Sequence, residues 1–201
     1  VYIPDHGNQR IQKWVPGAAE GVTVAGGNGG SGSNQFSSPY GVAVDALGNV
    51  YVADTYNHRI QKWTPDATEG VTVAGGNGDG SVANQFNFVQ GVAVDASGNI
   101  YACDDGNHRI QKWVPGATEG VTVAGGNGRG GNANQLANPS GVAIDALGNV
   151  YVADQDNNRI QKWVSGATEG ITVAGGNGQG NNSNQLARPT GVGVDASGNI
   201  Y

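Results

Sequence analysis

One stretch of the chain is written four times with little change, and it constrains the fold more than any other feature. Residues 91–101 read Gly-Val-Ala-Val-Asp-Ala-Ser-Gly-Asn-Ile-Tyr, and closely similar text fills residues 41–51, 141–151 and 191–201. The closing tyrosines, with Tyr2 before them, are spaced 49 residues apart once and 50 residues apart three times. The chain is therefore a tandem array, whose units bury their apolar sides against one another.

Each repeat predicts four short strands. Apolar runs at residues 42–44 and 50–53 are followed by a mixed run at 59–63 and a short apolar run at 71–73. Segments rich in Gly, Asn, Asp and Pro separate these runs, as turns require. No window shows a sustained helical period, so the sequence predicts an all-β chain.

A four-stranded antiparallel meander repeated in this way favours a β-propeller, because neighbouring blades cover both apolar faces of each blade. We expect a single domain over residues 1–201, and in a closed ring a strand at 191–195 would complete the N-terminal blade. Residues 200–201 repeat residues 1–2, so both ends claim one place in a closed four-bladed ring. A closed ring and a segment of a larger propeller both stay open, and we expect the segment. The repeats fall at about 1–49, 50–99, 100–149 and 150–199.

The segment after the second strand resembles a known repeat. Residues 52–63 read Val-Ala-Asp-Thr-Tyr-Asn-His-Arg-Ile-Gln-Lys-Trp. With the stretch at 91–101, this closely resembles the NHL repeat, which is named for Asn-His-Leu. Asn57-His58 and Asn107-His108 keep the first two letters, whereas the other two repeats have Gln9 and Asn158 in place of the histidine. The resemblance covers the whole chain and implies a propeller, for which six blades are the commoner number. It implies no single activity, since the family includes protein scaffolds and RNA-binding modules and has lyases and hydrolases among its relatives.

The charge balance disfavours nucleic acid as a partner. The chain has 10 basic and 16 acidic residues, a net charge of −6, and its cations are spread at about one Arg and one Lys per repeat. Nucleic-acid binding needs a concentrated basic face.

No apolar run approaches the roughly 20 residues that cross a bilayer, so we expect no membrane insertion. The chain lacks methionine and opens in mid-pattern, so we read it as a piece of a longer protein. We expect an extracellular or cell-surface location, with the cytoplasm left open. The single cysteine, Cys103, is expected to be a small buried residue.

Differences between the four copies gather at two places: the turn before the third strand and the long loop before the next first strand. In an antiparallel meander these two connections lie at the same end of the strands. All the variation therefore falls on one face of the predicted disc, which is typical of a recognition surface. Unconstrained drift of loops would give the same pattern. Aromatic and arginine side chains there favour recognition, because they anchor many interfaces. The predicted binding residues are Tyr56, Phe88, Gln90, Asp105, Arg129, Asp156 and Arg188.

A second set of polar residues recurs in every repeat. A carboxylate, an amide and a guanidinium so close together could suggest catalysis or a metal site, but four equivalent copies do not make one active site. Turns rich in backbone donors need such side chains as partners. We therefore predict a structural turn network and no metal or cofactor. Its members are Asp54, Asn57, His58, Arg59, Asp104, Asn107, His108, Arg109, Asp154, Asn157 and Arg159. Separately, Asn181 begins an Asn-Asn-Ser sequon, a candidate N-glycosylation acceptor.

The leading functional hypothesis is a non-enzymatic binding or scaffold module whose variable face recognises a protein or a glycan. One alternative is a propeller-type metal-dependent lyase or lactone-type hydrolase. The other is a structural filament or matrix component that self-associates through free strand edges.

Overall fold

The computed structural model describes residues 1–201 and is all-β, as predicted. Four antiparallel sheets follow one another along the chain, with the strand orders β1-β2-β3, β4-β5-β6-β7, β8-β9-β10-β11 and β12-β13-β14-β15. The three complete sheets are four-stranded meanders, the blades of a β-propeller. The strands are β1 (Tyr2–Asp5), β2 (Arg10–Lys13), β3 (Val22–Gly26), β4 (Pro39–Val44), β5 (Val50–Asp54), β6 (Arg59–Trp63), β7 (Val71–Gly75), β8 (Val89–Val94), β9 (Ile100–Asp104), β10 (Arg109–Trp113), β11 (Val121–Gly125), β12 (Pro139–Ile144), β13 (Val150–Asp154), β14 (Arg159–Trp163) and β15 (Ile171–Gly175).

A short 3₁₀ turn connects the second and third strands of each complete sheet, and β1 to β2 in the first sheet, where the sequence predicted only a turn. These turns are η1 (His6–Asn8), η2 (Thr55–Asn57), η3 (Asp105–Asn107) and η4 (Gln155–Asn157). Each is followed by a residue in the left-handed region, such as His58 with φ 51° and Asn158 with φ 54°. That residue reverses the chain into the third strand. The structure has no helix that could span a bilayer.

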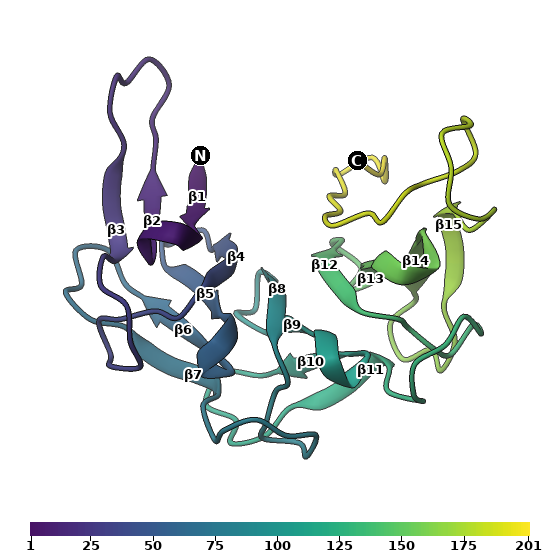
Figure 1. Ribbon diagram of the computed structural model, residues 1–201, viewed down its shortest axis with the longest axis horizontal. Helices are drawn as coiled ribbons and strands as arrows, with labels where there is room; N and C mark the ends of the chain where they lie inside the picture. The colour runs from purple at the N-terminus through teal and green to yellow at the C-terminus, as the bar shows by residue number, and fades with distance from the viewer.

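The first strands of the sheets lie side by side along the inner edge of the molecule (Figure 1). β4 contacts β8, and β8 contacts β12. Glycine permits this close approach: a Cβ added to Gly91 would lie 2.6 Å from the carbonyl oxygen of Ser140 and 3.0 Å from the Cα of Gly141. Each complete sheet takes its first strand from the end of one repeat and its other three strands from the next.

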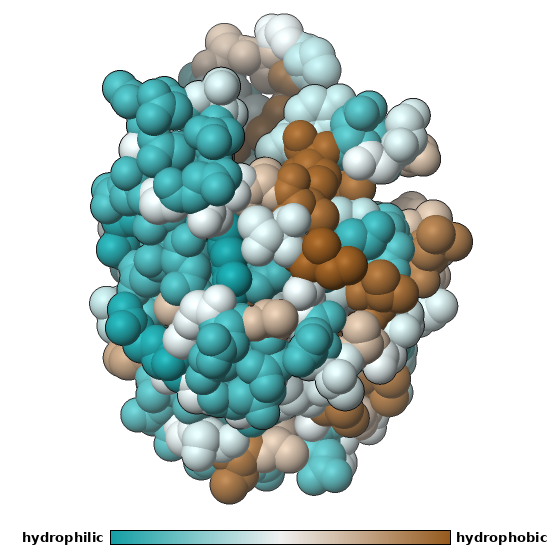
Figure 2. All heavy atoms as spheres, turned by 90° about the vertical axis from the view of Figure 1, so that its right-hand side faces the viewer, coloured by the Kyte–Doolittle hydropathy of each residue, from teal (hydrophilic) through white to brown (hydrophobic).

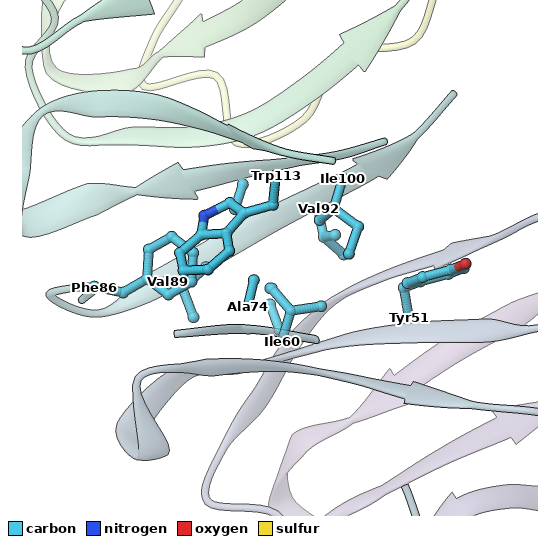
Figure 3. Close-up of a cluster of buried hydrophobic side chains, with 10 residues drawn as sticks. Tyr51, Ile60, Ala74, Phe86, Val89, Val92, Ile100 and Trp113 are labelled. Atoms are coloured by element: carbon cyan, nitrogen blue, oxygen red, sulfur yellow. The ribbon is translucent and has the colours of Figure 1, made fainter. Parts of the chain in front are cut away.

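Side chains from adjacent sheets interlock to form the core, as Figure 3 shows for the second and third sheets. Tyr51 and Ile60 come from one sheet, while Val92 and Trp113 come from the other, and all four are buried. The ring of Phe86, from the long loop, packs against Trp113 with centroids 5.8 Å apart. Burying each such side chain contributes about 1.5–3 kcal/mol, so the sheets are held to one another by apolar contact.

The four sheets form an open arc (Figure 1). Residues 191–201 join none of the sheets and contain only an antiparallel bridge between Val194 and Ile200. A Cβ added to Gly141 would lie 2.8 Å from the Cα of Gly191, so this segment lies beside β12 as the next inner strand. In this structure the N-terminal sheet has three strands, and residues 191–195 do not pair with it. The same glycine contact recurs between successive inner strands, and the segment continues their row beyond β12 (Figure 1).

The outer side of the last sheet is the most apolar part of the surface near the C-terminus. Figure 2 shows a band of hydrophobic residues on the side that carries β15 and the C-terminal segment. Val173 of β15 is exposed, whereas the equivalent Val73 and Val123 pack against the sheet that follows them. No further sheet covers this side in the structure.

Candidate binding face

The 3₁₀ turns and the long loops meet at one end of the sheets. The backbone N–H of Tyr56 donates to the carbonyl oxygen of Ser37 at 3.1 Å, and that of Gly106 donates to the carbonyl oxygen of Asn87 at 2.9 Å. The same bond joins Asp156 to the loop before β12. The structure thus brings both variable positions of each repeat onto one face, which we call the variable face.

A buried carboxylate fastens each turn to the loop beside it. Asp54 is fully buried and accepts hydrogen bonds from the Ser37 N–H at 2.6 Å, from Asn57 Nδ2 at 2.8 Å and from Arg59 Nε at 2.7 Å. Arg59 also donates to the carbonyl oxygens of Gly32 and Gln35. Burial raises the pKa of Asp54, against the opposing effect of these donors.

The turn network recurs in the next two sheets. Asp104 with Asn107 and Arg109, and Asp154 with Asn157 and Arg159, make the same bonds, each with an Asp–Arg distance of 2.7 Å. Burial likewise raises the pKa of Asp104. All the members predicted for the network lie in it, apart from the two histidines, which have a separate role.

Each histidine accepts a hydrogen bond from the loop that leads into the next sheet, a contact that we call the tether. His58 Nδ1 accepts the backbone N–H of Phe88 at 3.3 Å, and His108 Nδ1 accepts that of Asn138 at 3.3 Å. The repeats without histidine make the same bond by other acceptors: Gln9 Oε1 binds the N–H of Ser38 at 2.7 Å, and Asn158 Oδ1 binds that of Arg188 at 2.9 Å. The fold requires a hydrogen-bond acceptor at this position rather than a histidine. This explains why two repeats can have Gln or Asn there.

One half of the variable face is aromatic. The rings of Tyr56 and Phe88 meet edge to face with centroids 5.4 Å apart, and the His58 ring lies 5.3 Å from Phe88. Tyr56 and Phe88 line a cup of about 480 Å³ between the first three sheets. Its lining residues are His6, Ser38, Tyr40, Thr55, Tyr56, Phe88, Gln90 and Asp105.

Four of the predicted binding residues line this cup, and four lining residues were not predicted. Thr55 occupies the same repeat position as Asp105, and Tyr40 the same position as Gln90. Matching the predicted residues to their equivalents in neighbouring repeats could have found both. What the sequence does not show is that three consecutive sheets contribute to one cup.

Two polar atoms in the cup lack partners. Thr55 is 7% exposed, and its Oγ1 has no hydrogen-bond partner. The Oδ1 atom of Asp105 is buried without a hydrogen-bond partner as well. Burial raises the pKa of Asp105, and no cationic side chain forms an ion pair with it.

The other half of the variable face is charged. Asp156 lies between two arginines, 2.9 Å from Arg129 Nη2 and 2.8 Å from Arg188 Nη1. Both arginine side chains are 59% exposed. One carboxylate against two guanidinium groups leaves this half with a net positive charge.

The remaining candidate residues lie apart from the cup and the charged half. No group of three or more His, Cys, Asp or Glu side chains is arranged as a metal site. Cys103 is buried, as expected, and burial raises the pKa of its thiol. Asn181 is exposed in the loop after β15.

Comparison with known families identifies the repeat. Residues 36–63, 86–113 and 136–163 match the NHL repeat. Each match runs from the last part of the long loop to the tryptophan that ends the third strand, and so includes the turn network and the tether. No curated protein sequence matches the chain.

Solved structures share the fold at low sequence identity. A structural genomics protein of unknown function from Bacteroides thetaiotaomicron VPI-5482 has a TM-score of 0.63 and 15% identity, covering 99% of this chain and 62% of its own. A nidogen/laminin complex has a TM-score of 0.68 and 20% identity over 94% of this chain and 64% of its own. A streptogramin B lyase has a TM-score of 0.52 and 14% identity over 81% of this chain and 46% of its own.

The chain therefore spans less than two thirds of the length of each of these structures. Identities this low establish the architecture alone. Three segments of this chain are thus NHL repeats, and they lie on three successive four-stranded sheets of a β-propeller.

Proposed function

We propose that the chain is a non-enzymatic recognition module that binds a protein partner through the variable face. The NHL-repeat family fits a binding or scaffold role in general. The observation that carries the proposal is the contrast between a repeated frame and unlike side chains. The buried Asp–Arg pairs and the tethers recur from sheet to sheet, while the exposed residues that they position differ from sheet to sheet.

The character of the face supports a protein as the partner. Exposed Tyr56 and Phe88 lie on one half, and exposed Arg129 and Arg188 lie on the other. Aromatic residues and arginines supply much of the binding energy at protein interfaces. One structure with the same fold is that of a nidogen/laminin complex, two proteins bound to each other. We further propose an extracellular or cell-surface setting for this role.

A binding role is also supported by how the carboxylates are used. Asp54, Asp104 and Asp154 are buried in ion pairs with arginine, which leaves them unavailable as general acids or bases. The likeness to a streptogramin B lyase extends to fold at 14% identity and carries no residue roles.

The proposal predicts that side chains of the variable face can be exchanged with loss of binding and no loss of fold. Two double variants use residues already present at equivalent positions of other repeats: Tyr56→Gly with Phe88→Asn, and Arg129→Gln with Arg188→Ser. Leu47→Ser, at an 81% exposed position on the opposite face, is the matched control because Ser97 is its equivalent. Biotinylated wild-type and variant chains are incubated with secreted proteins and cross-linked, and the retained proteins are quantified by mass spectrometry.

We expect some proteins to be retained equally by the wild type and the control. With one or both double variants, the retained amount of these proteins should be at least about tenfold lower. Equal retention by all variants would contradict the proposal. A glycan array read with the same chains reports binding to a glycan instead, and concentration-dependent polymerisation in sedimentation reports a structural role. Either result, in the absence of a protein partner, overturns the proposal.

A further inference from the structure

Asp105 stands apart from the other half-buried or buried carboxylates on the variable face. Asp54, Asp104 and Asp154 each pair with an arginine, and Asp156 pairs with two. Asp105 is half-buried and has no cationic partner. A charge withdrawn from water without a counter-charge is unfavourable, so this site gains from a cation supplied from outside.

Asp105 Oδ1 is a buried acceptor without a hydrogen-bond partner, although side-chain hydrogen bonds from Gln90 and Asn138 reach this carboxyl group. Thr55 Oγ1 is buried without a partner in the same cup, and the Gln90 side chain also lines it. Oxygen atoms of a carboxylate, a hydroxyl and an amide all accept hydrogen bonds. The cup therefore matches a ligand that donates several hydrogen bonds at once.

Aromatic rings form the rest of the cup. Tyr56 and Phe88 pack edge to face, and Tyr40 lies beside His6 with ring centroids 6.4 Å apart. The faces of aromatic rings attract cations, and a guanidinium group also stacks on them because it is planar.

We propose that this cup receives an arginine side chain of the protein partner. The guanidinium group donates to the carboxylate of Asp105, to Thr55 Oγ1 and to the Gln90 amide oxygen, while its flat face lies against Tyr56 and Phe88. The inference rests on the proposed function and names the side chain that the aromatic half of the variable face recognises.

Two other ligands fit less well. A lysine ammonium group meets the charge of Asp105, but its compact shape does not stack on rings or engage several acceptors in one plane. A neutral sugar can pack on the aromatic rings and bind the hydroxyl group. It would remove more water from the Asp105 carboxylate, however, without compensating its charge. The net charge of −6 of the whole chain also favours a cationic partner segment.

The test uses the ¹⁵N-labelled 201-residue chain and four probes: Ac-Gly-Arg-Gly-NH₂, the same peptide with citrulline or with lysine, and glucose. Citrulline keeps the shape of arginine without its charge. We expect the arginine peptide to shift the backbone amide signals of Thr55, Tyr56, Phe88, Gln90 and Asp105, with weaker binding of the lysine peptide. The citrulline peptide and glucose are expected to shift them little at the same concentration.

Variants of the cup complete the test. Asp105→Asn removes the charge at constant size, and Asp105→Gln places there the residue found at position 155. We expect each to weaken the arginine peptide by about tenfold or more, because a charged hydrogen bond is lost. Phe88→Asn removes an aromatic ring of the cup and should also weaken binding of the arginine peptide. Asp66→Asn, on an exposed turn, is the control that should leave this affinity unchanged. Thermal melts confirm that the variants fold.

The outcomes separate this inference from the proposed function. Citrulline or glucose binding as well as arginine, an unchanged affinity of both Asp105 variants, or no shift in the cup overturns the inference. If the arginine peptide fails while Tyr56→Gly with Phe88→Asn still abolishes capture of a protein, the variable face binds a partner by other contacts. If the peptide binds the cup and no protein is captured, the proposed function fails and the inference fails with it.

Discussion

A single carboxylate in each turn between second and third strands gathers donors from two segments that are distant in sequence. Asp104 accepts the backbone N–H of Asn87, the amide of Asn107 and the guanidinium of Arg109. The sequence could predict this use, because a repeated polar set in a turn has backbone donors to satisfy. It could not predict that His58 and His108 act apart from the set, since their partners lie 30 residues onward.

Replacement of one such carboxylate should therefore be costly. We expect Asp104→Asn to lower the free energy of unfolding by about 3–5 kcal/mol, because it leaves the Arg109 guanidinium buried without its counter-charge. Asp5→Asn is the matched control, since the Asp5–Arg10 pair joins the same atoms at 2.8 Å but is partly exposed, so its loss should change stability much less. Urea unfolding of the two variants measures both values, and equal losses would contradict the buried role of Asp104.

The binding residues could be predicted from the sequence only as positions. Comparison of the four copies singles out Tyr56, Phe88 and Asp105 because they vary against a constant background. Their grouping into an aromatic cup, and the separate clamp of Asp156 by two arginines, depend on which side chains face each other across sheet boundaries. That information resides in packing, which a repeat pattern does not contain.

At the scale of single elements, strand positions agree closely with the sequence pattern. The predicted runs at 50–53 and 59–63 are β5 and β6, and each predicted apolar triplet lies inside a longer strand. The first strands extend further than their apolar core suggests: β8 begins at Val89, before the glycine at position 91. The pattern marks where side chains are buried, whereas the hydrogen-bonded ladder continues beyond that part.

Close approach of the inner strands predicts a sharp dependence on glycine. In Gly91→Ala the added methyl group would meet backbone atoms of Ser140 and Gly141, so β8 and β12 would have to move apart. We expect a loss of about 1–3 kcal/mol in the free energy of unfolding. The same change at Gly191, where nothing lies within 4 Å of the added Cβ, should be nearly neutral. Chemical denaturation of both proteins checks the difference, and a similar loss at both positions would refute strand contact as its cause.

The hairpin between the first two strands carries a carboxylate whose pKa is lowered, whereas that of Asp104 is raised. Asp95 accepts the backbone N–H groups of Ser97 and Asn99, the Asn99 amide and the hydroxyl of Tyr101. Burial acts to raise the pKa of Asp95, but these hydrogen bonds outweigh it and the pKa is lowered. A lowered pKa in the folded state means that Asp95 stabilises the protein above its unfolded pKa of about 3.9.

That stabilisation should disappear in acid. We expect Asp95→Asn to unfold at a lower urea concentration than the wild type at pH 7, and the gap to close as the pH falls below about 4 and through the lower folded pKa. Because the comparison is between two proteins at each pH, the titration of other carboxylates largely cancels. A gap that stays constant between pH 7 and pH 2.5 would show that the aspartate acts through shape alone.

At the scale of the whole molecule, the sequence predicts the architecture and leaves its closure open. A repeat of about 50 residues, with its four apolar runs, indicates how many strands each unit contains. It does not indicate the angle between successive units. That angle depends on how side chains such as Phe86 and Trp113 pack between sheets and on how closely the inner glycines approach. This is why the repeat pattern alone leaves both a closed ring and an open arc possible for the same strands.

The tether from each 3₁₀ turn to the next loop has a consequence for how such a surface can change. The residue displayed at position 88 or 188 is held by its main-chain N–H, which every amino acid except proline possesses, and the acceptor belongs to the preceding sheet. The side chain at this position can therefore change without loss of the hydrogen bond that holds the residue in place. Duplication, loss or exchange of whole repeats can assemble new combinations of displayed groups while every junction remains interchangeable.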